Sequence, residues 1–134
     1  MVKPIHLKQD LEHIPMLTER FGHPDDEESR KSFATLSEYR DGGIYAAHFS
    51  GDSGWERHPN GDEVVQILEG ITRFNVIVDD EIQSMELSAG MMVIVPQGCW
   101  HRFQSETGVK VMTTTPKPTE HTHVDDPRTE GVDS

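Results

Sequence analysis

Turn-forming residues recur every few positions through the middle of this chain, and this rhythm constrains the fold more than any other feature. Between residues 32 and 115, short runs rich in aliphatic, aromatic and β-branched residues alternate with turn residues. The runs are FATLSEY, IYAAHFS, WERH, EVVQILEG, ITRFNVIV, IQSMEL, MMVIV, CWHRF and VKVMTTT. No helical crossover has room between them, so the pattern predicts an all-β fold, an antiparallel sandwich or barrel.

The segments on either side of this middle part are polar. Residues 1–31 form an N-terminal arm, in which Leu7, Leu11 and Ile14 recur at helical spacing and predict a short helix. Residues 116–134 form a polar C-terminal tail rich in proline, threonine and acid, which lacks the apolar surface to order itself independently. We expect one domain, residues 32–115, with the tail docked on it or loose.

Charge and cysteine content exclude several classes of function. The formal net charge is −12, so neither nucleic acid nor an anionic membrane surface is an expected partner. No run approaches the roughly 18 apolar residues of a spanning helix. Cys99 is the only cysteine, which excludes an intrachain disulfide, and the N-terminus lacks the apolar segment of a secretory signal. We expect a soluble, cytoplasmic protein.

Potential metal ligands cluster around the turn sequence PNGD. His58 and Glu63 flank this turn, which is typical of a hairpin and would make them a directly opposed cross-strand pair with Cβ atoms about 4.5 to 5.5 Å apart. Glu56 precedes His58 by two residues and therefore shares its face of the strand. The three side chains are expected to converge on one bound metal ion.

A second segment, GMMVIVPQGCWHRF, carries an apolar strand, a tight turn and then His101. Its spacing is similar to the second conserved motif of the cupin superfamily, with a departure at Ser105, where the motif has asparagine. The first cupin motif is also matched, by His58, Glu63 and Gly70. There Glu56 stands where the motif has its first histidine, and Ser50 stands where it has its leading glycine.

The resemblance to small single-domain cupins implies an antiparallel double-stranded β-helix, or jelly-roll, barrel that holds a divalent metal. It implies His58, Glu63 and His101 as ligands. Glu56 has two open roles: it completes the coordination sphere, or it is catalytic as a general base. Two histidines with one or two carboxylates suit Fe, Mn, Ni or Zn, and the sequence does not select among them.

Other histidines and the cysteine have weaker interpretations. His48 and Cys99 are candidates to line the barrel cavity; the alternatives are a core hydrogen bond for His48 and a small buried apolar role for Cys99. His121 and His123, in the polar tail, are expected to be solvated.

Two classes of function remain open at this point. The first is a metal-dependent enzyme acting on a small organic substrate, a dioxygenase, isomerase or lyase, with oxygenase chemistry slightly favoured by the ligand set. The second is a non-catalytic module that binds a small ligand or a metal, because fold alone does not decide between them. The resemblance also implies a homodimer.

Overall fold

The computed structural model describes residues 2–128, and within them the chain is mostly strand. The elements are α1 (Leu7–Glu12), β1 (Leu17–Phe21), α2 (Glu27–Arg30), β2 (Phe33–Tyr39), β3 (Gly42–Asp52), β4 (Trp55–Arg57), β5 (Glu63–Val78), β6 (Glu81–Ser88), β7 (Met92–Val95), β8 (His101–Pro116) and β9 (Glu120–Thr122). The predicted helix of the arm is confirmed as α1. The arm also contains the short helix α2, whose first turn is capped by Asp26.

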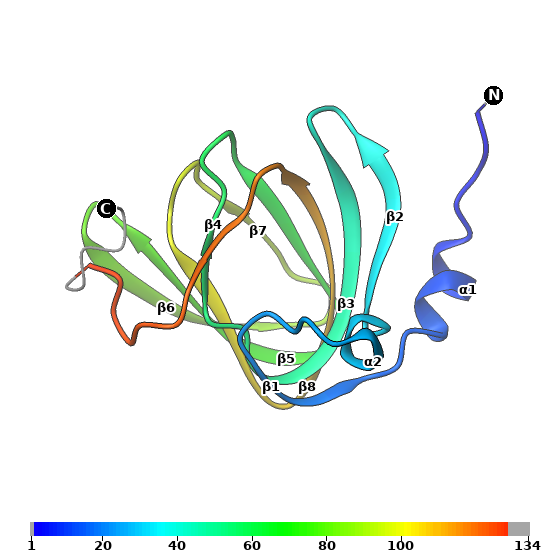
Figure 1. Ribbon diagram of the computed structural model, residues 1–134, viewed down its shortest axis with the longest axis horizontal. Coiled ribbons are helices and arrows are strands. Elements are labelled where there is room, and N and C mark those ends of the chain that lie inside the picture. The colour runs from blue at the N-terminus through cyan, green and yellow to red at the C-terminus, as the bar shows by residue number, and fades with distance from the viewer. Residues whose placement is uncertain (1, 129–134) are drawn as a thin grey trace.

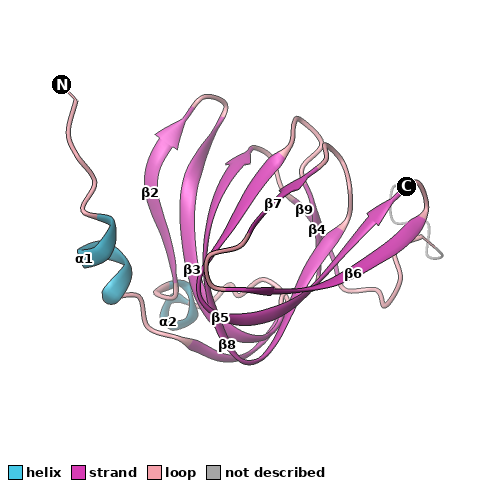
Figure 2. Ribbon diagram, turned by 180° about the vertical axis from the view of Figure 1, so that it is seen from behind, coloured by secondary structure: helices cyan, strands magenta, loops and turns pink. Residues whose placement is uncertain are grey.

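The strands form one strongly curled sheet, so the predicted all-β barrel fold is confirmed (Figures 1 and 2). Strand β8 pairs with β3 and β5, while β5 also pairs with β6 and β7. These pairings are antiparallel, whereas β1 runs parallel to β3. The curl wraps the sheet around a core formed by Ala47, Phe49, Val65, Ile67, Phe74, Val76, Leu87, Val95, Phe103, Val109 and Val111.

Two expected turns lie inside continuous strands. The breaks anticipated at Gly70 and at the sequence SETG are instead bends within β5 and β8, each of which runs for 16 residues. Gly70 and Gly108 have φ values of +82° and +121°, and a Cβ atom on Gly70 would lie 2.1 Å from the Gly108 carbonyl oxygen. Glycine therefore lets the two strands bend and touch without ending.

The predicted hairpin at PNGD is wrong. Strand β4 pairs with β8 and β9, and β5 pairs with β6, β7 and β8, so the loop connects two strands that are not paired. Turn residues reverse the chain direction, but they do not determine which strand the next segment joins. By contrast, the turn before β6 is a true hairpin, because Asp79 and Asp80 both adopt the positive φ of a two-residue loop.

The polar ends of the chain contribute to the sheet. In the arm, Leu11 and Ile14 pack on Ala46 of β3, and the Lys110 ammonium donates to the Leu11 carbonyl at 2.8 Å. In the tail, β9 pairs with β4, with His121 opposite Glu56. Both ends therefore reach the strands that carry the candidate ligands. Among the described residues, no helix has the length and apolar character needed to cross a membrane.

Candidate metal centre

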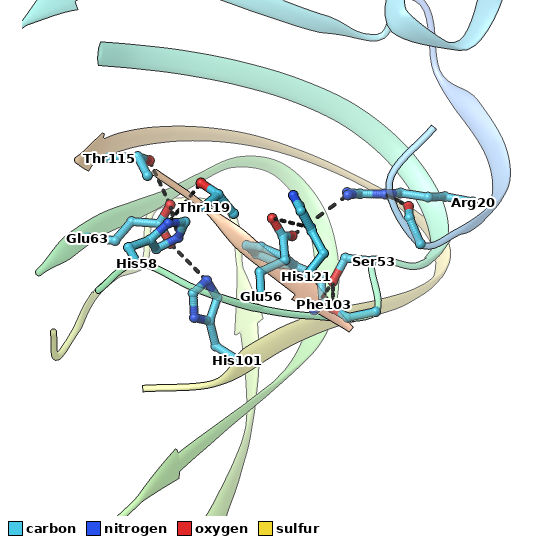
Figure 3. A network of polar contacts seen from close by, with 12 residues as sticks. Arg20, Ser53, Glu56, His58, Glu63, His101, Phe103, Thr115, Thr119 and His121 are labelled. Atoms are coloured by element: carbon cyan, nitrogen blue, oxygen red, sulfur yellow. Dashed lines mark hydrogen bonds and ion pairs between the residues drawn. The ribbon is translucent and has the colours of Figure 1, made fainter. Parts of the chain in front are cut away.

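Three of the predicted ligands meet inside the sheet. His58 follows β4, Glu63 begins β5 and His101 begins β8, and each is at most 5% exposed. His58 Nε2 lies 3.2 Å from Glu63 Oε2, and His101 Nε2 lies 3.1 Å from Glu63 Oε1. One potential ligand atom from each residue lies within 4.8 Å of the others (Figure 3). The convergence expected for His58 and Glu63 is thus present without the hairpin.

Hydrogen bonds on the far side of each group orient these side chains. His101 Nδ1 lies 3.0 Å from the Cys99 carbonyl oxygen, which can only accept, so Nδ1 carries the proton. His58 Nδ1 lies 3.0 Å from the Thr119 hydroxyl, and the Thr115 hydroxyl donates to Glu63 Oε2 at 2.6 Å. Such outer contacts set the tautomer and direction of metal-binding groups.

This arrangement leaves lone pairs facing one another. With its proton on Nδ1, a neutral His101 points the Nε2 lone pair at Glu63 Oε1. His58 Nε2 and Glu63 Oε1 are buried and have no hydrogen-bond partner among the described residues, despite the short contacts. Buried polar atoms without partners are costly. A positive charge among these atoms, either a proton or a metal ion, relieves the repulsion.

The pKa values reflect the same electrostatics. Burial is the largest influence on the Glu63 carboxyl and would raise its pKa, but the contacts from His101 and His58 hold that pKa well below its usual range. Burial is also the largest influence on His101 and favours its neutral form, yet Glu63 and, more weakly, Glu56 raise its pKa above the ordinary value. Without a metal, these carboxylates therefore favour the protonated form of His101 more than water does.

The donor set fits a divalent ion. Ligand atoms about 2.1 Å from one ion and at right angles to each other are about 3 Å apart, close to the two imidazole-to-carboxylate separations. Two histidines with one carboxylate form the donor set of non-haem iron sites and also suit Mn, Ni and Zn. His58, Glu63 and His101 are therefore the residues that could hold a divalent metal.

The three residues lie in the wall of a cavity of about 430 Å³. Its remaining wall includes apolar side chains of the core and polar groups from both ends of the chain. They are Arg20, His23, Phe33, Ala34, Thr35, Tyr45, Ala46, Ala47, Phe49, Glu56, Phe103, Val111, Thr113, Thr115, Pro116, Lys117, Thr119 and His121. The cavity has room for a small organic molecule beside the ligand group.

Glu56 lines the cavity on the same side as His58, as the strand alternation predicts. Its Oε1 lies 3.7 Å from an Arg20 amino group and its Oε2 lies 3.7 Å from His121 Nδ1. Figure 3 shows Glu56 directed toward these two residues rather than toward Glu63. Its ligand atoms are not part of the group formed by His58, Glu63 and His101.

The two other candidate lining residues lie outside the cavity wall. His48 donates from Nδ1 to the Ile14 carbonyl at 3.0 Å and so ties the arm to β3, which is the alternative considered for it. The Cys99 side chain packs against the core cluster, and burial, with Asp79 and Asp62, raises the pKa of its thiol. Cys99 contributes to the metal centre through its backbone carbonyl, which accepts a hydrogen bond from His101, and not through its sulfur.

The sequence interpretation missed the contribution of the chain ends. His121, expected to be solvated in the tail, lies in the cavity wall, where its ring stacks on His23 at 4.8 Å between centroids. Arg20 reaches the same wall from β1. The alternation of His121 and His123 along an extended segment was a weak signal, but nothing in it indicated β4 as the partner strand.

Comparison with known proteins agrees with this architecture. The cupin domain model matches residues 47–115, which is just over half of the chain. Acireductone dioxygenase of Rhodopseudomonas palustris is 40% identical over 50 residues, covering 37% of this chain and 30% of that protein. The uncharacterized protein YdbB of Bacillus subtilis is 31% identical over 72 residues, covering 53% and 60%. The chain thus spans less than two thirds of either relative.

Solved structures share the fold. A cupin-2 domain protein from Shewanella frigidimarina has a TM-score of 0.51 at 25% identity, over 68% of this chain and 80% of that one. Hydroquinone 1,2-dioxygenase from Sphingomonas sp. TTNP3, with 4-hydroxybenzoate bound, has a TM-score of 0.55 at 18% identity, over 64% and 65%. The family model, which matches just over half of the chain, and the shared fold show that this chain belongs to the cupin domain family.

Proposed function

We propose that this cupin binds one divalent ion, Fe, Mn, Ni or Zn, through His58, Glu63 and His101, and acts on a small organic molecule in the adjacent cavity. Non-haem oxygenase chemistry is the preferred reaction type. The observation that carries the proposal is the convergence of three buried ligand residues at the cavity wall, where His58 Nε2 and Glu63 Oε1 have no hydrogen-bond partner among the described residues. A bound ion would supply a Lewis-acid centre with coordination positions left for other ligands.

The chain's own residues prepare this site. The Cys99 carbonyl and the Thr119 hydroxyl hold the two imidazole rings so that Nε2 of each faces the site, and Thr115 orients the Glu63 carboxylate. Apolar side chains such as those of Phe49 and Phe103 line the cavity beside these polar groups. A substrate would therefore meet polar groups that are already oriented.

For Glu56 we propose the role of general base. Its carboxylate is held near Arg20 and His121, beside the three ligand residues rather than among them, which supports a task toward the substrate. Strand pairing places its backbone opposite that of His101, so it lies at the edge of the site. Glu56→Gln should then keep normal metal content and lose turnover, whereas loss of metal would assign Glu56 to the coordination sphere.

Oxygenase chemistry is supported by two relatives with dioxygenase names, one similar in sequence over a short segment and one in fold. The test is oxygen uptake by iron-loaded protein with a panel of small acids and phenols that includes hydroquinone. His101→Ala should abolish uptake, while His13→Ala, at an exposed position of the arm, should leave it intact. Binding of panel members without any oxygen uptake would contradict the proposal and favour a non-catalytic module. The homodimer stays a prediction that light scattering tests.

A further inference from the structure

One buried arginine has no role in the proposed metal centre. Arg20 is 6% exposed, and its guanidinium lies over the rings of Phe33 and Phe49, at 4.9 and 4.6 Å from their centroids. Its Nε donates to the Gly22 carbonyl at 2.7 Å. These contacts fix the side chain in one direction, with its terminal amino groups toward the cavity (Figure 3).

The terminal amino groups of Arg20 have unused hydrogen-bonding capacity. A guanidinium offers five N–H donors, and among the described residues only the Nε donor has a hydrogen bond. The ion pair with Glu56, at 3.7 Å, is too long to be a hydrogen bond. Arginine binds planar oxyanions with two parallel hydrogen bonds, a geometry that nothing in the described structure supplies here.

The charges of the cavity favour one additional negative group. With its histidines neutral, as metal ligands are, the cavity has three buried or half-buried charged side chains, Arg20, Glu56 and Glu63, which sum to −1; Lys117 lies exposed at the rim. A divalent ion at the proposed site would change this sum to +1. The chain as a whole carries −12, so attraction for an anion would be confined to this cavity.

We infer that the Arg20 end of the cavity binds the carboxylate of a small organic monoacid, which makes carboxylic acids the substrate class. This inference rests on the proposed function, because the remainder of the acid would then face His58, Glu63 and His101. One guanidinium and one surplus positive charge match a monoanion better than a phosphate dianion. His23 and His121 border the same end and offer imidazole N–H donors.

The test is calorimetric titration of zinc-loaded protein with benzoate, its neutral analogue benzamide, and phenyl phosphate. Wild type should bind benzoate in preference to the other two. Arg20→Gln should weaken benzoate binding about tenfold or more, without weakening benzamide. Glu56→Gln should strengthen benzoate binding, since it removes a competing carboxylate. Arg73→Gln, at an exposed position of β5 outside the cavity wall, should change neither.

The double variant Arg20→Gln with Glu56→Gln separates a carboxylate on Arg20 from one on the metal. If benzoate sits on Arg20, the gain from Glu56→Gln disappears once Arg20 is also replaced. A gain that persists would place the carboxylate on zinc and overturn the inference. The double variant removes both partners of the Arg20–Glu56 ion pair, so neither charge is left buried without the other. It therefore remains usable as a test if Arg20→Gln alone does not fold.

Zinc content, measured on the same samples, distinguishes the two levels of the argument. Stoichiometric zinc without a preference for benzoate over benzamide, or with tighter binding of phenyl phosphate, contradicts the inference and leaves the metal proposal standing. Absence of zinc with an Arg20-dependent preference for benzoate supports the inference and contradicts the metal proposal.

Discussion

Replacing Thr115 with valine tests whether the support around Glu63 matters. The Thr115 hydroxyl donates to Glu63 Oε2 at 2.6 Å, a length typical of a charged hydrogen bond, and the two residues are only 7% and 5% exposed. Valine keeps the shape of the side chain and removes the hydrogen-bond donor to Glu63. Loss of a hydrogen bond to a buried charge costs about 1.5 to 3 kcal/mol.

We therefore expect Thr115→Val to weaken zinc binding by about 10-fold to 100-fold, the usual effect of losing an outer hydrogen bond at a metal site. That range corresponds to about 1.4 to 2.8 kcal/mol, in agreement with the hydrogen-bond value. The assay is competition with a chromophoric chelator at fixed pH. Thr114→Val is the matched control, because the neighbouring side chain points to the opposite face of β8. Equal affinities for the two variants would refute the reasoning.

Three further predictions concern the metal centre and the strain at glycines. Zinc affinity should fall as pH is lowered, starting above pH 6.5, because the pKa of His101 is raised and its proton competes with the ion. Well below that pKa, the affinity should fall about tenfold per pH unit. An affinity that does not change with pH contradicts this prediction. Zinc at 100 times its Kd should add about 2.7 kcal/mol to the free energy of unfolding, measured by urea denaturation, and the increment should be absent in His101→Ala. Gly51→Ala should destabilise the fold by more than the strain of about 1 to 3 kcal/mol expected for a residue near φ +100°, because its Cβ would also lie 2.2 Å from the Arg20 carbonyl oxygen. Gly90→Ala is the control, because Gly90 has φ +92° and no atom within 4 Å of an added Cβ, so this variant has the backbone strain without the clash.

The strands and the ligand residues could be predicted from the sequence because both depend on local signals. Apolar runs bounded by turn residues mark strands wherever the chain reverses, and the spacings around His58, Glu63 and His101 match a known family. Strand partners are not local. The PNGD turn gives the same signal whether or not the strands that it joins are paired, so the hairpin was an error.

The Arg20 end of the cavity could not be predicted from the sequence for the same reason. Glu56 and His121 face each other only because β9 adds to the edge of β4, and Arg20 reaches the cavity only because β1 adds to β3. Both additions come from segments with little apolar periodicity, which composition assigns to solvent. These two segments become ordered by pairing with free strand edges, which exist only once the rest of the sheet has formed.

The most direct test of the account is metal content after reconstitution. Chelator-stripped protein, incubated with a divalent ion and then desalted, should retain one ion per chain, as measured by elemental analysis. His58→Ala and His101→Ala should retain none, while His13→Ala should match the wild type. A wild-type chain that takes up no ion, or an His101→Ala variant that takes up a full equivalent, would contradict the metal centre.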